Sequence, residues 1–169
     1  MHTISCKELR QLLLYEPDTG VFRRIKIVDP HSRVNIGDIA GSVSHGYRRI
    51  KLGGRAGRAY GAHRLAWLYM MGEWPNGEVD HIDGNPDNNR WANLRLADRS
   101  NNTANSRRRS DNTSGVKGVH FDKSSGKWRS ELSARGRRIF LGYFTSPEAA
   151  AAAYEAAALQ YFGEFARVA

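Results

Sequence analysis

Residues 80–102 read DHIDGNPDNNRWANLRLADRSNN, and this stretch places acids, amides and a histidine inside a hydrophobic pattern. The pattern predicts a strand over 79–82, a polar loop over 86–89, a second strand over 91–96 and a helix over 99–107. An acid beside a histidine, followed by spaced asparagines, can supply the ligands of one divalent cation and one general base. We therefore expect the chain to be organised around this stretch.

The neighbours Asp80 and His81 carry the chemistry expected of a hydrolytic site. Neutral histidine can take a proton from water near pH 7. A hard cation such as Mg²⁺ prefers oxygen ligands, which Asp80 and an asparagine amide can supply. Because neighbouring residues of an extended strand point to opposite sides, a local bend must bring Asp80 and His81 to one site.

Two other interpretations of the stretch are a calcium loop and a set of turn formers. A calcium loop is excluded because the alternating acids are missing and Trp91 stands in place of the closing glutamate. Turn formation explains a first group of polar residues, which we interpret as loop residues: Asp83, Asn85, Asn88 and Asn89. It explains less well the combination of Asp80, His81, Asn93 and Asn102.

The N-terminal part predicts a small β-rich region over residues 1–60 that begins with a helix over 5–14. Glycine-punctuated short strands follow, among them 21–25 and 47–52. An amphipathic helix is expected over 63–71, ended by a glycine. We interpret His63 as a structural residue at the start of that helix.

The C-terminal part, from residue 106 onward, has a sequence pattern of its own. Residues 106–115 contain no apolar side chain, and we expect a basic and polar linker over 108–115. Three short runs within 116–144 then predict an antiparallel meander. Two registers are open for the start of an alanine-rich helix that reaches about residue 162: Thr145 with Glu148 as a capping box, or Ser146 as the cap before Pro147. The fold class is therefore α+β, with a strand–loop–strand–helix core over 61–107 and a three-stranded antiparallel sheet packed on one helix over 116–169.

The charge of the chain favours a polyanionic partner. The formal net charge is +9 and the isoelectric point is near 10.0. Residues 107–138 hold ten Lys or Arg and three Asp or Glu, a net of +7, so most of the excess lies there. Such a field raises the local concentration of phosphate groups, which indicates nucleic acid as the partner, although a merely soluble basic protein is the alternative.

Cysteine content and hydropathy exclude several classes. The single cysteine, Cys6, excludes an intramolecular disulfide and a four-cysteine zinc site, and we expect no structural zinc. No apolar run approaches the roughly 20 residues of a membrane span, and the N-terminus lacks the apolar core of a signal peptide. We expect a cytoplasmic protein that does not bind membranes.

The stretch 80–102 resembles the ββα-metal motif of HNH endonucleases, in the phage and intron-homing branch whose third motif position is asparagine. The resemblance rests on Asp80-His81-Ile82-Asp83-Gly84-Asn85, on residues 88–95, and on Asn102, with residues 46–47 and 63–67 in support. It implies that His81 is the general base and that Asn93 orients it. It also implies that Asp80 and Asn102 hold one divalent metal, Mg²⁺ by first choice and Mn²⁺ as the alternative, with Asn101 as the fallback ligand.

The C-terminal part resembles an AP2-type DNA-binding domain, through residues 116–119, 126–128, 138–144 and the helix that begins near Glu148. Asp122 and Ser133 stand where that family has arginines, so its target sequence does not carry over. Together with the linker arginines, the resemblance and the basic sheet face give these expected DNA-binding residues: Arg107, Arg108, Arg109, Lys117, His120, Lys127, Arg129, Glu131, Arg138 and Phe140.

The two resemblances together imply a homing-type, metal-dependent DNA endonuclease that leaves 5′-phosphate and 3′-hydroxyl ends. Its partner is double-stranded DNA, and we expect a monomer, with a dimer as the alternative for double-strand cleavage. A phage or mobile element in a bacterial host is the expected context. The rival hypothesis is a non-catalytic, sequence-specific DNA-binding regulator, and an RNA-directed protein is a third possibility.

Overall fold

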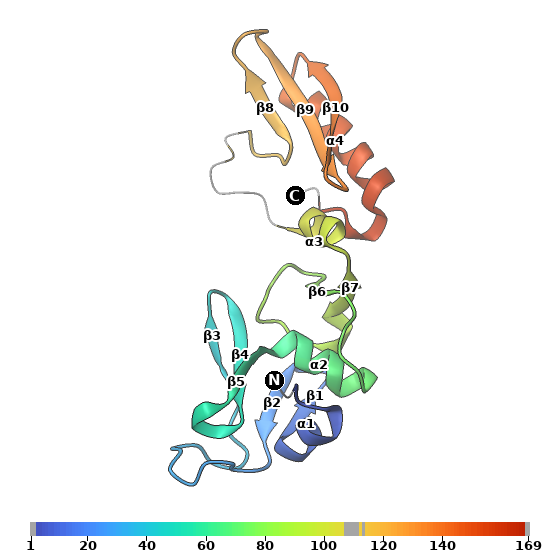
Figure 1. Ribbon diagram of the computed structural model, residues 1–169. Helices are drawn as coiled ribbons and strands as arrows, with labels where there is room; N and C mark the ends of the chain where they lie inside the picture. The colour runs from blue at the N-terminus through green and yellow to red at the C-terminus, as the bar shows by residue number, and fades with distance from the viewer. Residues whose placement is uncertain (1–2, 107–111, 113, 168–169) are drawn as a thin grey trace. The chain divides into compact units, whose positions relative to one another are not determined.

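The computed structural model describes residues 3–106, 112 and 114–167. Contacts divide the chain into two units, Met1–Leu96 and Ala97–Ala169, and each is described here by itself (Figure 1). No helix among the described residues is both long and apolar enough to cross a membrane. Each unit has its own hydrophobic core.

The first unit begins with helix α1 (Cys6–Leu12), which Ser5 and Glu8 close with a capping box. The predicted helix over 5–14 is too long at its end. Leu13 is extended and starts strand β1 (Leu13–Glu16), which pairs antiparallel with β2 (Val21–Arg24). The reason is burial, because Leu13 and Tyr15 enter the core while Leu14 faces solvent, the alternation of a strand.

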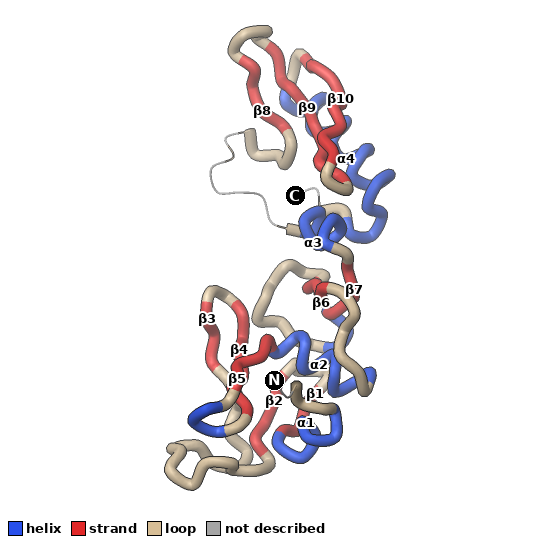
Figure 2. The backbone as a smooth tube through the Cα atoms, in the orientation of Figure 1, coloured by secondary structure: helices blue, strands red, loops and turns tan. Residues whose placement is uncertain are grey.

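Strands β3 (Ser42–Ser44), β4 (Tyr47–Leu52) and β5 (Arg58–Gly61) form an antiparallel sheet in that order, with a short 3-10 helix η1 (Gly54–Ala56) between the last two. Helix α2 (Ala62–Met71) follows directly and ends at Gly72, whose φ of +81° suits glycine. The buried face of α2 packs into the core of the first unit. Figure 2 shows the sheet leading into this helix.

Strand β6 (Glu78–His81) pairs with β7 (Leu94–Ala97) in a two-stranded sheet. The second strand was expected to begin at Trp91, but Trp91–Asn93 forms a 3-10 helix, η2. Backbone contacts explain the difference, because the amide of Trp91 donates to Pro17 O at 2.9 Å and the amide of Asn93 donates to Arg90 O at 2.9 Å. The connection between β6 and β7 is therefore longer than expected, and it contains the short helix η2.

The second unit contains helix α3 (Arg99–Asn105), strands β8 (Val119–Asp122), β9 (Lys127–Ala134) and β10 (Arg137–Phe144), helix α4 (Pro147–Phe162) and the 3-10 helix η3 (Gly163–Phe165). The sheet is antiparallel with β9 in the centre, and α4 packs on it. Ser146 caps α4 and Pro147 takes its first turn, as the sequence predicts. The second unit therefore contains the three-stranded antiparallel sheet packed on one helix that the sequence predicts.

Helix α3 packs within the second unit. Ala104 belongs to the core under the sheet, and the Ser100 hydroxyl accepts a hydrogen bond from the Arg135 amide at 3.0 Å. The sequence places residues 61–107 in one region, whereas the contacts assign α3 to the unit that begins at Ala97.

Candidate active site

Asp80 and His81 lie at the end of β6, and both are only 5% exposed. Three consecutive residues of this strand are buried, beginning with Val79, so both of its sides are covered at this point. The strand ends immediately after His81, because Gly84 N donates to His81 O at 2.8 Å and closes a turn. Neighbouring side chains of a strand point to opposite sides, so cover on both sides is what buries Asp80 and His81 together.

The imidazole of His81 is held at one nitrogen by an amide. Its Nε2 lies 3.3 Å from Asn89 Oδ1. The Asn89 amide is oriented by its other end, since Nδ2 donates to Asp87 O at 3.0 Å. An amide oxygen only accepts, so Nε2 of neutral His81 carries the proton and Nδ1 keeps its lone pair.

Burial lowers the pKa of His81 below its usual 6.5, and this effect outweighs the opposing ones. The hydrogen bond with Asn89 and the charges of Asp83, Asp80 and Asp87 act the other way and raise the pKa. His81 is therefore neutral near pH 7, the form in which a histidine can accept a proton.

Asp80 has a cationic partner on the neighbouring strand. Arg95 Nε lies 3.1 Å from Asp80 Oδ2, and the two side chains are 12% and 6% exposed. An isolated charge in such surroundings is costly, and the guanidinium offsets that cost. The pair fixes the carboxylate on the sheet formed by β6 and β7.

Asn93 closes the connection between the strands. Its Oδ1 accepts from the Asp83 amide at 3.0 Å, and its Nδ2 donates to Asp83 Oδ1 at 3.0 Å and to Asn88 O at 2.8 Å. Asn88 Nδ2 in turn donates to Asp83 Oδ2 at 2.6 Å. The expected role of Asn93 is to orient His81. Asn93 contacts Asp83 in the turn that follows His81 and Asn88 farther along the loop, so an effect of Asn93 on His81 acts through that turn.

Asn89 is the residue that the sequence analysis missed, because it was interpreted as a turn former. It is 1% exposed, and its amide oxygen contacts His81 directly. Its backbone carbonyl accepts from the buried Tyr15 hydroxyl at 2.6 Å. Tyr15 lies far away in the sequence, on β1, so no local pattern around Asn89 could have shown that this asparagine is buried.

Asn102, the second expected metal ligand, is half-buried on α3 in the second unit. Asp98 caps this helix, because its side chain accepts a hydrogen bond from the backbone amide of Asn101 at 2.7 Å. Asn101, the fallback ligand, thus has a structural contact through its backbone. Among the described residues no three His, Cys, Asp or Glu side chains gather in a way that could hold a metal ion. A carboxylate and an amide oxygen are hard donors that fit Mg²⁺, which retains several waters and takes oxygens from its substrate.

The expected DNA-binding residues on strands β8, β9 and β10 lie on one face of the sheet. Cross-strand pairs place His120 beside Arg129 and Phe140 beside Glu131. Arg129 donates to Glu131 at 2.9 Å, and its guanidinium lies 5.5 Å from the centre of the Phe140 ring. Lys127, His120 and Arg138 are exposed, and Arg138 lies 3.8 Å from Glu131. Arg107, Arg108 and Arg109 lie outside the described residues.

Simple alternation along β10 predicts Tyr143 on the helix-facing side of the sheet with Ile139 and Leu141, and this prediction is wrong. A β-bulge between Phe140 and Gly142 inserts one residue into β10 and shifts the alternation. Tyr143 therefore pairs with Arg129, and its ring lies 5.3 Å from that of Phe140. The exposed face gains a second aromatic ring.

Lys117, another expected DNA contact, has structural partners. Its Nζ donates to Ala104 O at 2.7 Å and to Ser106 O at 2.8 Å, at the end of α3. Burial, with a smaller effect of Arg167, lowers the pKa of Lys117 to about 8. The ammonium group satisfies carbonyls at the C-terminal end of a helix, where a cation is favourable.

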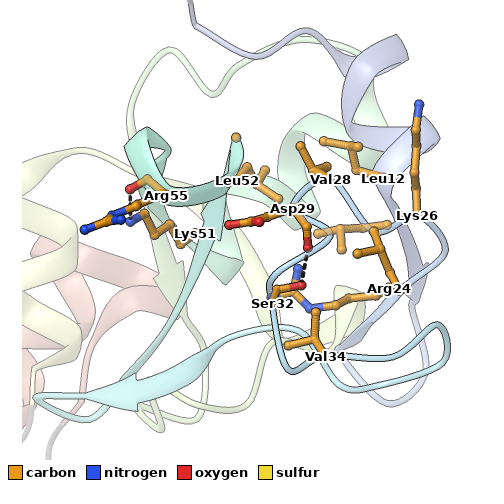
Figure 3. A pocket seen from close by; sticks show the side chains of 14 residues that line it. Leu12, Arg24, Lys26, Val28, Asp29, Ser32, Val34, Lys51, Leu52 and Arg55 are labelled. Atoms are coloured by element: carbon orange, nitrogen blue, oxygen red, sulfur yellow. Dashed lines mark hydrogen bonds between the residues drawn. The ribbon is translucent and has the colours of Figure 1, made fainter.

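A cavity of about 260 Å³ in the first unit is a separate feature (Figure 3). Residues of the β2–β3 connection and of β4 line it, among them Arg24, Asp29, Ser32 and Leu52. None of the residues around His81 lines this cavity. We therefore assign the candidate chemistry to the end of β6.

Comparisons with known proteins cover the segment that contains β6. Residues 60–104 match a family described as HNH endonuclease. Protein 3.8 of Escherichia phage T7 is 40% identical over 77 residues, which cover 45% of this chain and 64% of that protein. The match therefore spans less than two thirds of that relative.

A solved structure described as DNA binding and cleavage by the HNH homing endonuclease I-HmuI is 29% identical, with a TM-score of 0.45. The match covers 62% of this chain and 57% of that one. The segment that holds α2, β6, β7 and most of α3 is thus similar to HNH endonucleases, by the match of residues 60–104.

Proposed function

We propose that this protein is a divalent-metal-dependent DNA endonuclease in which His81 is the general base. The observation that carries the proposal is the state of His81. It is buried beside an acid at a strand end, it is neutral near pH 7, and its Nε2 is held by Asn89. A fixed neutral imidazole with a defined lone pair is suited to remove a proton from water. The match of residues 60–104 to HNH endonucleases supports the same reading.

Each residue of the centre has a separate role in this proposal. Nδ1 of His81 takes the proton of the attacking water, and Asn89 keeps Nε2 protonated and the ring oriented. Asp80 and Asn102, the ligands that the HNH resemblance implies, would hold one divalent cation, with Mg²⁺ the first choice, and Arg95 keeps the Asp80 carboxylate in place. When bound, the cation supplies positive charge beside the phosphate oxygens and the leaving 3′ oxygen. The products carry 5′-phosphate and 3′-hydroxyl ends.

DNA recognition is assigned to the exposed sheet face of the second unit, in the manner of an AP2-type domain. The support is a face that combines cations with two aromatic rings, Phe140 and Tyr143. Cations contact phosphates without reading sequence, while aromatic and polar side chains can reach base edges. A monomer with one centre nicks one strand.

The test is the nicking of supercoiled plasmid with Mg²⁺ or Mn²⁺, with and without chelator, by the wild type and His81→Ala. We expect metal-dependent nicking that His81→Ala reduces by at least about 1,000-fold, because the base is removed. Equal nicking by His81→Ala would show that His81 is not the base. A wild type that shifts DNA in gels but never nicks it under any divalent metal would instead support the regulator.

A further inference from the structure

We propose that His63 is a positioning residue whose ring, packed against His81, holds that imidazole in the orientation the reaction requires. The proposal deepens the proposed function and rests on it. His63 lies in the first turn of α2, on a different element from His81, and the sequence offers only a structural role for it. Three features of its surroundings indicate that His63 also positions His81.

The first feature is the contact between the two rings. Their centroids lie 5.2 Å apart and their planes are inclined by 68°, an edge-to-face arrangement. Tyr47 of β4 completes the group, with its ring 5.7 Å from that of His63 and 6.2 Å from that of His81. The terminal torsion of a histidine has broad preferences, so a fixed ring needs neighbours that restrain it. Asn89 restrains one nitrogen of His81, and the His63 ring restrains the body of the ring.

The second feature is the space that the chain keeps for the His63 ring. A Cβ on Gly61 would lie 2.7 Å from Cε1 of His63 and 3.2 Å from its Nδ1. The φ of Gly61 is −69°, which any residue can adopt. Glycine is therefore needed at this position for room and not for backbone conformation. The ring lies folded back over the start of α2, where it meets His81.

The third feature separates positioning from catalysis. The Nδ1 atom of His63 is buried without a hydrogen-bond partner among the described residues, so this nitrogen is not placed to take a proton from water. Burial, and the nearby His81, Arg64 and Arg49, lower the pKa of His63 to about 4. A neutral ring adds no charge beside His81. His63 thus acts on His81 by contact between the rings.

The cleavage test uses His63→Ala and His63→Phe, with Leu68→Val as the matched control. Leu68 is equally part of α2 and fully buried, but lies outside the ring group. At saturating DNA, below the melting temperature, we expect His63→Ala to lower the nicking rate about 10- to 100-fold with unchanged DNA affinity. His63→Phe keeps a ring in place and should recover the rate to within about 5-fold. Leu68→Val should nick at the wild-type rate.

A second variant covers the case in which His63→Ala does not fold. Gly61→Ala keeps His63 but places a methyl group where its ring now lies, so the ring must move. Its nicking rate should fall in the same way. If His63→Ala or Gly61→Ala is folded and nicks at the wild-type rate, the positioning role is wrong.

A measurement that needs no activity separates this inference from the proposed function. In NMR spectra of histidine-labelled protein, the ring protons of His81 should give one sharp set of signals shifted by the adjacent rings. His63→Ala should move and broaden those signals, and His63→Phe should not broaden them. Unchanged His81 signals in His63→Ala overturn the proposal. Failure of the wild type to nick DNA, with the His81 signals changing as expected, overturns the nuclease assignment and leaves the ring contact supported.

Discussion

The two units place their polar side chains in opposite surroundings. In the first unit Asp80, His81 and Asn89 are almost fully buried, and each is held by a specific neighbour. In the second unit the sheet face carries exposed Lys127 and Arg138 around half-buried Arg129. Buried polar groups must be paired in one geometry, whereas exposed cations act through a summed field that survives the loss of any one. Single changes should therefore be severe in the first region and mild in the second.

The largest expected effect concerns acid stability of the buried region. The pKa of His63 is lowered from 6.5 to about 4, chiefly by burial. Between these values the unfolded chain binds a proton that the folded protein resists, so stability is full above pH 6.5 and falls as the pH drops toward 4. The loss attributable to His63 should reach roughly 3 kcal/mol. It is measured by urea unfolding at pH 7.5 and 4.5.

His63→Phe has no titrating group at this position and is the control for that loss. Carboxylates elsewhere lose their contributions equally in both proteins. The difference in acid loss between the wild type and the variant therefore isolates the histidine. An identical loss in both would mean that His63 is not the buried acid-sensitive group.

The second-largest expected effect follows the removal of the Asn89 side-chain amide, which is hydrogen-bonded to His81. Asn89→Ala removes the hydrogen bond to Nε2, and we expect the nicking rate to fall about 10- to 100-fold with little change in DNA affinity. The same bond raises the pKa of His81, so the acid limb of the pH–rate profile should also move to lower pH. Asn85→Ala, an exposed asparagine of the same loop, should retain the wild-type rate. Matching rates for the two variants would contradict a role for Asn89.

The smallest effect is expected on the sheet face. Lys127→Ala should weaken DNA binding only a few-fold and reduce the slope of log affinity against log salt by about 1, because one phosphate contact is lost. Lys7→Ala makes the same charge change on exposed α1 and serves as the control. Binding is measured by fluorescence anisotropy over a range of salt. If Lys7→Ala changes the slope as much as Lys127→Ala does, the second unit does not hold the contact face.

Prediction from the sequence succeeded where structure is determined locally. The strands of the second unit follow one another through short turns, and the start of α4 is encoded by Ser146 and Pro147, so neighbouring residues define them. Tyr143 is the exception. Its face depends on a bulge within β10, and simple alternation does not reveal an inserted residue.

Prediction was weaker where a residue's surroundings come from distant parts of the chain. The stretch 80–102 was found because Asp80 and His81 are adjacent and chemically distinctive. Asn89 was missed because the partner of its backbone carbonyl, Tyr15, lies on the first strand. His63 was interpreted as structural because its contact with His81 exists only once α2 is packed beside β6. Local patterns identify reactive residues more readily than the residues that hold them.

Gly20, in the turn between β1 and β2, packs against the backbone segment that carries Asn89. Its φ is +74°, and a Cβ there would clash with the backbone of Asn89 and Arg90. A larger residue at position 20 would displace the segment that carries Asn89. Position 20 lies far in the sequence from the expected DNA-binding residues of the second unit. Within the proposed function, such an allele would yield a protein that still occupies its target with the second unit but cannot cut it. Expressed beside the intact protein, it would compete for the same sites and behave as a dominant inhibitor.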